Sequence, residues 1–253
     1  MREFLDISHL LGMPEAASAH AADIDYMMAL VHWLMLILFI GWGAYFLYVL
    51  YRFRASKNPV ASYEGAKGTY SKIQEVAVVV VESVLLVGFA FPIWGLLKNE
   101  FPVANTTFEV HVIAEQFTWN IHYPGPDGIF GPLDPYLVNT ATNPIGLVMS
   151  DSTAMDDIVM IDELHLPLDR PVTLSLSSKD VIHSFGVPQL RVKQDIIPGL
   201  IIPIWFTPTL AGEYEIACAQ LCGIGHYKMK GYVTVEPMED VDAWLEDMAS
   251  GAF

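Results

Sequence analysis

Two long runs of uncharged, mostly apolar residues occupy the first hundred positions. Met27–Tyr51 contains 25 residues without Asp, Glu, Lys or Arg, and Val76–Leu97 contains 22 residues interrupted only by Glu82. As helices that rise about 1.5 Å per residue, both runs are long enough to cross a hydrocarbon core of about 30 Å. Each run alone also fits a buried helix of a soluble protein. Because a short link joins them, the pattern favours a hairpin of two membrane-spanning helices.

The charges that flank these runs predict their orientation. The link 52–75 carries five basic and two acidic residues, whereas one basic and five acidic residues precede the first run. Basic segments stay on the cytoplasmic side of a membrane, so the link is expected there and both chain ends outside. Residues 1–26 do not have the pattern of a signal peptide, since no basic segment leads into an adequate apolar run.

After the second run the pattern changes to short β-like segments. They are rich in β-branched and aromatic residues and are broken by Gly, Pro and Asp, as in a β-sandwich or barrel. The segments are Phe108–His122, Ile158–Leu166, Val172–Ser177, Ile201–Phe206, Glu213–Ala217 and Gly231–Val235. Residues 124–157 show no clear periodicity and predict a long excursion, and Met238–Met248 predicts a short acidic helix. We therefore divide the chain into residues 1–98, with the helical hairpin, and an external β domain of residues 99–253.

Composition agrees with this division. The chain has a formal charge of −16 but 53% hydrophobic residues, so charge and apolar residues must be segregated. Residues 99–253 hold 21 acidic and six basic residues, which gives that domain a charge of −15. A charge of this sign argues against nucleic-acid binding, which requires a basic surface. It suggests instead a face that attracts a basic partner through salt-sensitive steering.

The richest chemistry lies directly after the last residues of a predicted strand. Cys218, Cys222, His226 and Met229 place two thiols, an imidazole and a thioether within 12 residues. Soft sulfur ligands favour copper, zinc or iron–sulfur clusters, and imidazole suits copper and zinc. Glycines in this loop allow it to fold tightly enough for the side chains to converge.

Spacing alone leaves three interpretations open. A disulfide between Cys218 and Cys222 is reasonable outside the cytoplasm but explains neither His226 nor Met229. A structural zinc site would recruit His183 as a fourth ligand, although such sites use closer cysteines and no methionine. The third interpretation is a pair of copper ions bridged by two thiolates, each completed by a histidine and a weaker ligand.

A second segment links this loop to a known family. The stretch from Asp180 to Pro188, with His183 inside it, lies upstream of the cysteine loop, and together they closely resemble subunit II of the haem–copper cytochrome c oxidases. The resemblance covers nearly the whole chain. It implies a membrane-anchored α+β protein: a two-helix transmembrane hairpin followed by a cupredoxin-like Greek-key β-barrel that holds a dinuclear copper centre, CuA. The ligands it implies are His183, Cys218, Cys222, His226 and Met229, with the backbone carbonyl of Gln220.

The resemblance also implies a function and a location. Such a subunit takes electrons from a c-type cytochrome and passes them to haem in subunit I, which reduces oxygen to water and translocates protons. The protein would lie in the cell inner membrane, with both termini and the copper domain on the periplasmic side. The alternatives are the small subunit of a CuA-containing nitric-oxide reductase and a membrane-tethered copper carrier.

Two positions depart from the family pattern. In Gln116-Phe117-Thr118-Trp119 the family's usual electron-uptake tryptophan is replaced by Phe117, while Trp119 matches a second aromatic position. A strand that buries aromatic side chains would explain the same residues. Many members have Glu where this chain has Gln220, and that Glu helps to bind magnesium at the contact with subunit I. A neutral amide is a poorer ligand for this cation, so we expect a weakened magnesium site.

The remaining candidates concern protons and the surroundings of the metal. The resemblance implies an acid near the start of the second span that feeds protons to subunit I; Glu75 fits that place best, and Glu82 lies two turns deeper. Interfacial solvation and helix packing are the alternatives for both. Leu221, Ile224 and Phe185 are candidates for an apolar shell around the sulfur ligands, or for ordinary core packing.

Overall fold

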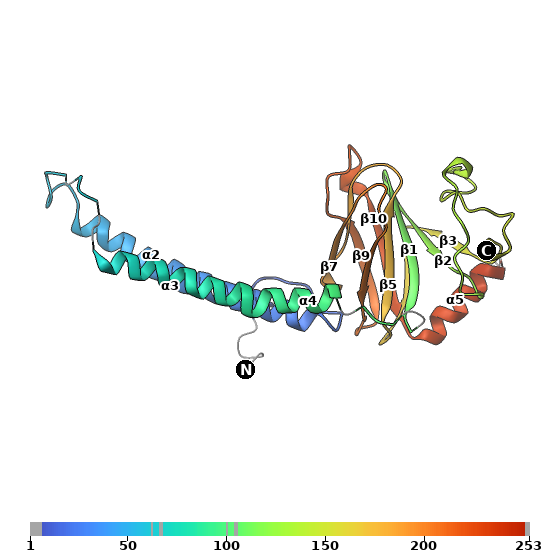
Figure 1. The fold of residues 1–253 in the computed structure, drawn as a ribbon, viewed down its shortest axis with the longest axis horizontal. Helices are drawn as coiled ribbons and strands as arrows, with labels where there is room; N and C mark the ends of the chain where they lie inside the picture. The colour runs from blue at the N-terminus through green and yellow to red at the C-terminus, as the bar shows by residue number, and fades with distance from the viewer. Residues whose placement is uncertain (1–6, 62, 66–67, 100, 104–105, 251–253) are drawn as a thin grey trace. The chain divides into compact units, whose positions relative to one another are not determined.

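The computed structural model describes residues 7–61, 63–65, 68–99, 101–103 and 106–250 (Figure 1). The chain forms two compact units. One consists of Met1–Met13 with Asp23–Asn99, and the other of Pro14–Ala22 with Glu100–Phe253. The first is helical and the second is built mainly from β-strands.

The helical unit contains both predicted apolar runs. Helix α2 spans Ala21–Arg52, and helix α3 spans Thr69–Leu85 and continues through a π-helical segment, Leu86–Ala90, into α4, Phe91–Asn99. The segments Ala21–Arg52 and Thr69–Leu96 are long and apolar enough to cross a membrane. Because their surfaces are also exposed and hydrophobic, they suit a lipid environment. The prediction of two long apolar helices is confirmed.

The β unit consists of two five-stranded sheets. Their strand orders are β3-β2-β1-β5-β8 and β4-β10-β9-β6-β7, and one parallel pair occurs in each, β1 with β5 and β10 with β4. The strands are β1 Phe108–Glu115, β2 Thr118–Tyr123, β3 Ile158–Ile161, β4 Glu163–Pro167, β5 Val172–Ser178, β6 His183–Val187, β7 Val192–Ile196, β8 Ile202–Phe206, β9 Gly212–Cys218 and β10 Lys230–Glu236. Apolar side chains such as Ile121, Leu174 and Phe206 are buried in a core between the sheets. The predicted β domain is confirmed, although the sequence pattern did not reveal β6 and β7.

Asp162 explains why one predicted strand is two. It has a φ of 61°, which ends β3 and lets the chain enter the other sheet as β4. Its carboxylate accepts hydrogen bonds from the backbone N–H of Trp119 at 2.7 Å and from Thr118 Oγ1 at 2.9 Å. Burial nevertheless raises the pKa of this carboxyl group. Asp tolerates this backbone conformation because its side chain is short and polar, and here the side chain also accepts hydrogen bonds from β2.

The predicted excursion, residues 124–157, is ordered and packs against one face of the first sheet. It forms two short 3-10 helices and a small hydrophobic cluster in which Ile145 and Leu147 contact Ile113 of β1. Asp157 accepts a hydrogen bond from Gly131 N at 2.8 Å and lies 2.6 Å from Nε2 of the buried His122. Asp157 therefore connects the beginning and the end of the excursion to each other and to β2.

A short segment before α2 also belongs to the β unit. Ala17 N donates to Gln189 O at 2.8 Å, and Ala17 O accepts from Thr209 N at 2.9 Å. Ser18 Oγ donates to Leu190 O at 2.6 Å, and Ala17 is fully buried. The predicted domain division between residues 98 and 99 did not anticipate that this N-terminal segment is hydrogen-bonded within the β unit.

Helix α5, Met238–Ser250, covers one side of the β unit. Val241 is buried, and the Trp244 ring stacks on the His165 ring with centroids 3.9 Å apart and planes at 13°. Trp244 also meets Tyr123 edge-on at 5.5 Å. Because its polar face is strongly acidic, these contacts are what attach the helix to the sheet.

Replacing Trp244 by Ala should therefore detach α5. Loss of a large, partly buried aromatic ring typically costs about 2–4 kcal/mol of unfolding free energy. Urea unfolding of the detergent-solubilised chain, combined with limited proteolysis after residue 237, measures both effects. Tyr136→Ala is the matched control, since Tyr136 is 96% exposed; equal protease resistance in the two variants would contradict the assigned role of Trp244.

Acid should destabilise the β domain through His111. Burial, and secondarily the neighbouring His122, lowers the pKa of His111 from 6.5 to about 4. Between these values the unfolded chain binds a proton that the native chain does not, so stability falls as the pH decreases from 6.5 to 4. We expect His111→Gln to remove about 1–3 kcal/mol of this pH dependence, measured as the difference in urea unfolding between pH 6.5 and 4.5. An identical pH dependence in wild type and variant would show that His111 is not responsible.

Candidate metal centre

One strand pairing brings the two ligand segments together. β6 begins at His183 and β9 ends at Cys218, and the two strands pair antiparallel with Phe185 opposite Cys218. The ladder continues past the end of β9, where Ala219 N donates to Ser184 O at 2.9 Å. His183 is therefore held beside the start of the cysteine loop, although it lies 35 residues earlier in the chain.

The loop itself folds back onto its own beginning. Residues 219–229 connect β9 to β10, and Cys218 N donates to Met229 O at 3.3 Å. A short 3-10 helix, His226–Lys228, turns the second half of the loop inward. Met229 then lies directly before β10, so a strand end fixes each side of the loop.

Six candidate ligands converge in this arrangement. The Sγ atoms of Cys218 and Cys222 are 3.8 Å apart, and Cys218 Sγ is 3.9 Å from His183 Nδ1. The ligand atoms of these three buried residues all lie within 4.8 Å of one another. Cys222 Sγ is 3.6 Å from His226 Nδ1 and 3.7 Å from Met229 Sδ. The carbonyl oxygen of Gln220 lies 3.2 Å from Cys218 Sγ.

These distances separate the three interpretations of the loop. Both cysteines are free thiols, so the disulfide is not formed. The cluster offers more donors than the four that a structural zinc ion uses, and two of them are a thioether and a backbone carbonyl. A donor set dominated by sulfur and imidazole suits a soft metal ion.

The pKa of the Cys222 thiol bears on how this cluster would bind a metal. Burial, together with the neighbouring Cys218, raises the pKa of the Cys222 thiol to about 11. The Cys222 thiol therefore carries its proton at neutral pH in the metal-free chain. A metal that binds this sulfur must displace the proton, which couples metal binding to proton release.

A carboxylate orients His183 from behind. His183 Nε2 lies 2.8 Å from Asp180 Oδ1, which leaves Nδ1 directed at Cys218. Burial disfavours the charged form of Asp180, but hydrogen bonds from His183, Gln116 N and Val181 N outweigh it and lower the pKa of this carboxyl. Carboxylates in this position commonly fix the tautomer and orientation of metal-binding histidines. From the sequence, Asp180 is a candidate for the contact with subunit I or a solvated loop acid; its place three residues before His183 was a usable signal for the orienting role.

The two aromatic candidates lie at different depths. The Phe117 ring packs against the metal loop so closely that a Cβ on Gly225 would lie 2.4 Å from Phe117 Cδ2. Trp119 is fully buried, with its ring 6.3 Å from the His183 ring and 5.7 Å from the Phe185 ring. Only Phe117 is partly exposed, so Trp119 is out of reach of a docked protein.

The expected apolar shell is only partly present. Phe185 is fully buried beneath the ligands, as expected. Leu221 and Ile224 point outward instead and are 77% and 96% exposed, because the inward positions of the loop are taken by the ligands themselves. The side chain of Gln220 is exposed as well.

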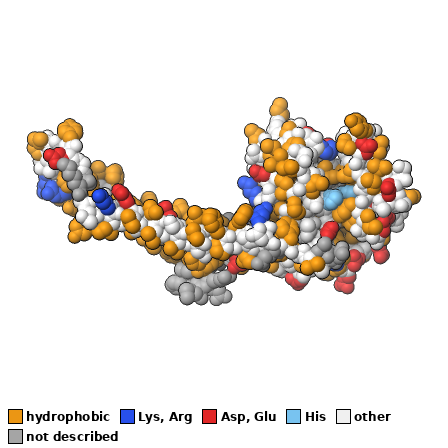
Figure 2. All heavy atoms as spheres, in the orientation of Figure 1, with side chains coloured by type: hydrophobic (Ala, Val, Ile, Leu, Met, Phe, Trp, Pro, Cys, Tyr) orange, Lys and Arg blue, Asp and Glu red, His pale blue; other side chains and the backbone are white. Residues whose placement is uncertain are grey.

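The surface over the metal loop carries little of the domain's acidity. Between residues 219 and 229 the sequence contains Lys228 and no Asp or Glu. In Figure 2 many acidic side chains of the β domain lie around α5, and the tip formed by the metal loop is mostly hydrophobic and uncharged. On the face shown in Figure 2, the acidic side chains of the domain therefore lie mainly away from the loop.

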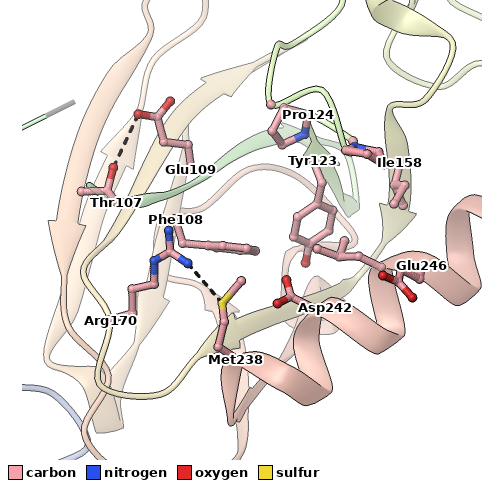
Figure 3. Close-up of a pocket in the computed structure, with 14 residues that line it drawn as sticks. Thr107, Phe108, Glu109, Tyr123, Pro124, Ile158, Arg170, Met238, Asp242 and Glu246 are labelled. Atoms are coloured by element: carbon pink, nitrogen blue, oxygen red, sulfur yellow. Dashed lines mark hydrogen bonds between the residues drawn. The ribbon is translucent and has the colours of Figure 1, made fainter. Parts of the chain in front are cut away.

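A separate cavity lies elsewhere in the β unit. It has a volume of about 560 Å³ and lies between α5 and the ends of β1 and β2 (Figure 3). Arg170 and Met238 meet at its wall, with Nη1 and Sδ 3.4 Å apart, and Asp242 and Glu246 line it from the helix. None of the six candidate ligands lines this cavity, so the candidate metal cluster lies outside it.

The acids Glu75 and Glu82 belong to the helical unit. Both lie in α3 with exposed side chains. Since they are seven residues apart, they project from nearly the same face of the helix. Neither contributes to the metal centre.

The sequence is similar to a family model and to curated proteins that are described as cytochrome c oxidase subunit II. Residues 108–236 match the family described as "Cytochrome C oxidase subunit II, periplasmic domain". An alternative cytochrome c oxidase subunit 2 of Bradyrhizobium diazoefficiens is 39% identical over 145 residues, which are 57% of this chain and 52% of that protein. The cytochrome c oxidase subunit 2 of Cereibacter sphaeroides is 27% identical over 256 residues, covering 96% of this chain and 81% of that protein.

A solved structure gives a partial match. The periplasmic domain of subunit II of cytochrome oxidase (CoxB) of Bradyrhizobium japonicum is 23% identical, over 59% of this chain and 97% of that one, with a TM-score of 0.43. Among the sequence relatives, the chain spans about half the length of the Bradyrhizobium diazoefficiens protein. The family match covers half of this chain and includes His183, Cys218, Cys222 and Met229, and the protein therefore belongs to the cytochrome c oxidase subunit II family.

Proposed function

We propose that the chain is the electron-receiving subunit of a respiratory terminal oxidase in the cell inner membrane. A c-type cytochrome would donate electrons to a dinuclear copper centre, CuA, in the β domain. Haem in a partner subunit would receive them for the reduction of oxygen to water, coupled to proton translocation. The observation that carries the proposal is the convergence of six metal donors at one end of the β domain in a member of this family.

The ligand atoms fit a pair of copper ions. Two metal–sulfur bonds of roughly 2.3 Å can span up to about 4.6 Å, so thiolates 3.8 Å apart can share a metal. His183 lies beside Cys218, and His226 and Met229 lie beside Cys222, which distributes nitrogen and weak donors over two positions. The bound copper pair would supply a one-electron redox couple.

The chain's own contribution is to hold these donors still. Cys218 and His183 are at strand ends, and Met229 is tied to Cys218 through the backbone. Strands position side chains more precisely than free loops. A site whose ligands cannot relax changes little in geometry when its charge changes, which favours rapid electron transfer.

Surface residues near the centre would meet its partners. Phe117, partly exposed and packed on the metal loop, is the better candidate for electron uptake, and buried Trp119 would support His183. The exposed side chain of Gln220 is available to a partner subunit, where a neutral amide would bind magnesium only weakly.

The proposed membrane arrangement has support from the N-terminal segment. Ala17 and Ser18 are hydrogen-bonded within the β domain, only a few residues before α2 begins. Both ends of the hairpin would then be on the side of the β domain, the periplasmic side. Glu75 and Glu82, on one face of α3, remain candidates for delivering protons to the haem-bearing subunit.

Copper content tests the site directly. The full chain in detergent should bind two coppers and show a mixed-valence paramagnetic resonance signal shared by both ions. Cys218→Ser should abolish this signal and reduce copper to one ion or fewer, because one of the two shared sulfur ligands is lost. One zinc ion per wild-type chain would refute the copper assignment.

Methionine variants provide the matched control for this experiment. Met229→Leu removes a proposed ligand and should alter the signal, whereas Met155→Leu changes an exposed methionine and should not. Circular dichroism of each variant shows whether the helices and sheets persist. A normal paramagnetic resonance signal in both Cys218→Ser and Met229→Leu would contradict the assignment of Cys218 and Met229 as ligands.

Gas consumption by the purified complex tests the reaction. With a reduced c-type cytochrome as donor, we expect oxygen uptake and no consumption of nitric oxide. Nitric-oxide turnover without oxygen turnover would favour the reductase alternative. Copper that exchanges readily with the medium, with neither gas consumed, would favour a copper carrier.

A further inference from the structure

Gln116 joins three segments that are distant in sequence. It lies in the turn between β1 and β2 and donates two hydrogen bonds. Its backbone N–H donates to Asp180 Oδ2 at 2.7 Å, and its side-chain Nε2 donates to the carbonyl oxygen of Cys222 at 2.5 Å. These partners are 64 and 106 residues away along the chain.

The first bond connects Gln116 to His183. The carboxylate of Asp180 accepts from Gln116 N through Oδ2 and lies 2.8 Å from His183 Nε2 through Oδ1. Val181 N donates to the same Oδ1 at 2.6 Å. The turn before β2 and the orientation of the His183 ring therefore depend on one shared carboxylate.

The second bond connects Gln116 to the cysteine loop. Its acceptor is the backbone carbonyl of Cys222, whose thiol is a proposed ligand. The next residue, Gly223, has a φ of +141°, and a Cβ there would lie 2.6 Å from Gln116 Nε2. Phe117 covers Gly225 in the same way. The loop is thus shaped to receive both side chains.

We propose that Gln116 is a positioning residue that clamps the His183 segment and the cysteine loop together before the metal binds. The inference rests on the proposed function, since it treats His183 and Cys222 as ligands. The two hydrogen bonds that Gln116 donates go to Asp180 and to the Cys222 backbone, so it acts through these groups. Without its amide donor, the loop would have to be ordered when the metal binds, and that ordering weakens binding.

The test replaces the amide donor in two ways. Gln116→Glu keeps the length of the side chain, and Gln116→Leu removes the donor without adding a charge. The matched control is Gln194→Glu, because the Gln194 amide also donates to a backbone carbonyl, that of Asp195 at 3.1 Å, in β7 outside both ligand loops. The full chain in detergent is used throughout.

Two measurements are made on each variant. In the metal-free chain, hydrogen exchange of residues 219–229 should be faster in both Gln116 variants and unchanged in Gln194→Glu. In the copper-loaded chain, loss of copper to a chelator should increase about tenfold or more, which is typical of residues that support metal ligands. Exchange and copper retention equal to wild type would overturn the proposal, as would faster exchange with unchanged copper retention.

Failure of the proposed function gives a different result. If wild-type chain binds no copper pair, the function is wrong, whereas the exchange rates of the metal-free chain still report on the clamp. If either Gln116 variant loses the circular dichroism of the folded chain, the other is used for both measurements. Faster exchange across the whole β domain in both variants would mean a general structural role and would also overturn the proposal.

Discussion

The antiparallel pairing of β6 with β9 is the constraint on which the rest of the site depends. Two residue pairs, Phe185 with Cys218 and Gly186 with Ala217, define this register. Since alternate residues of a strand face opposite sides, a shift of one residue would turn Cys218 away from His183. The buried Phe185 helps to hold the register from below. The convergence of the candidate ligands is therefore a consequence of sheet pairing as much as of their own chemistry.

A layer of hydrogen bonds around the ligands adds rigidity to this frame. Asp180 orients His183, Gln116 reaches both Asp180 and the Cys222 backbone, and Met229 O closes the loop on Cys218 N. Each bond alone contributes only about 0.5–1.5 kcal/mol. Together they restrict the few torsions that would otherwise let the donors disperse. In the proposed function, this preorganisation is what permits electron transfer with little rearrangement.

The distribution of polar and apolar surface separates the tasks of the chain. Two apolar helices fit a membrane, and α5 carries a strongly acidic face on the β domain. The tip over the metal loop is exposed and mainly uncharged, with Leu221, Ile224 and Tyr227 pointing outward. Exposed apolar side chains of this kind are typical of surfaces that meet other proteins. The N-terminal segment around Ala17 is hydrogen-bonded within the β unit.

The sequence by itself determined the two apolar helices, the β character of the second half and the set of candidate metal donors. These properties reside in composition, in periodicity and in the close spacing of Cys218, Cys222, His226 and Met229. It did not reveal β6 and β7, because the fully buried β6 shows no alternation of polar and apolar residues and β7 consists mostly of polar residues. Nor did it reveal the outward direction of Ile224 or the two hydrogen bonds of Gln116. Only the tertiary structure decided these, since they depend on which distant segments the sheet register places side by side.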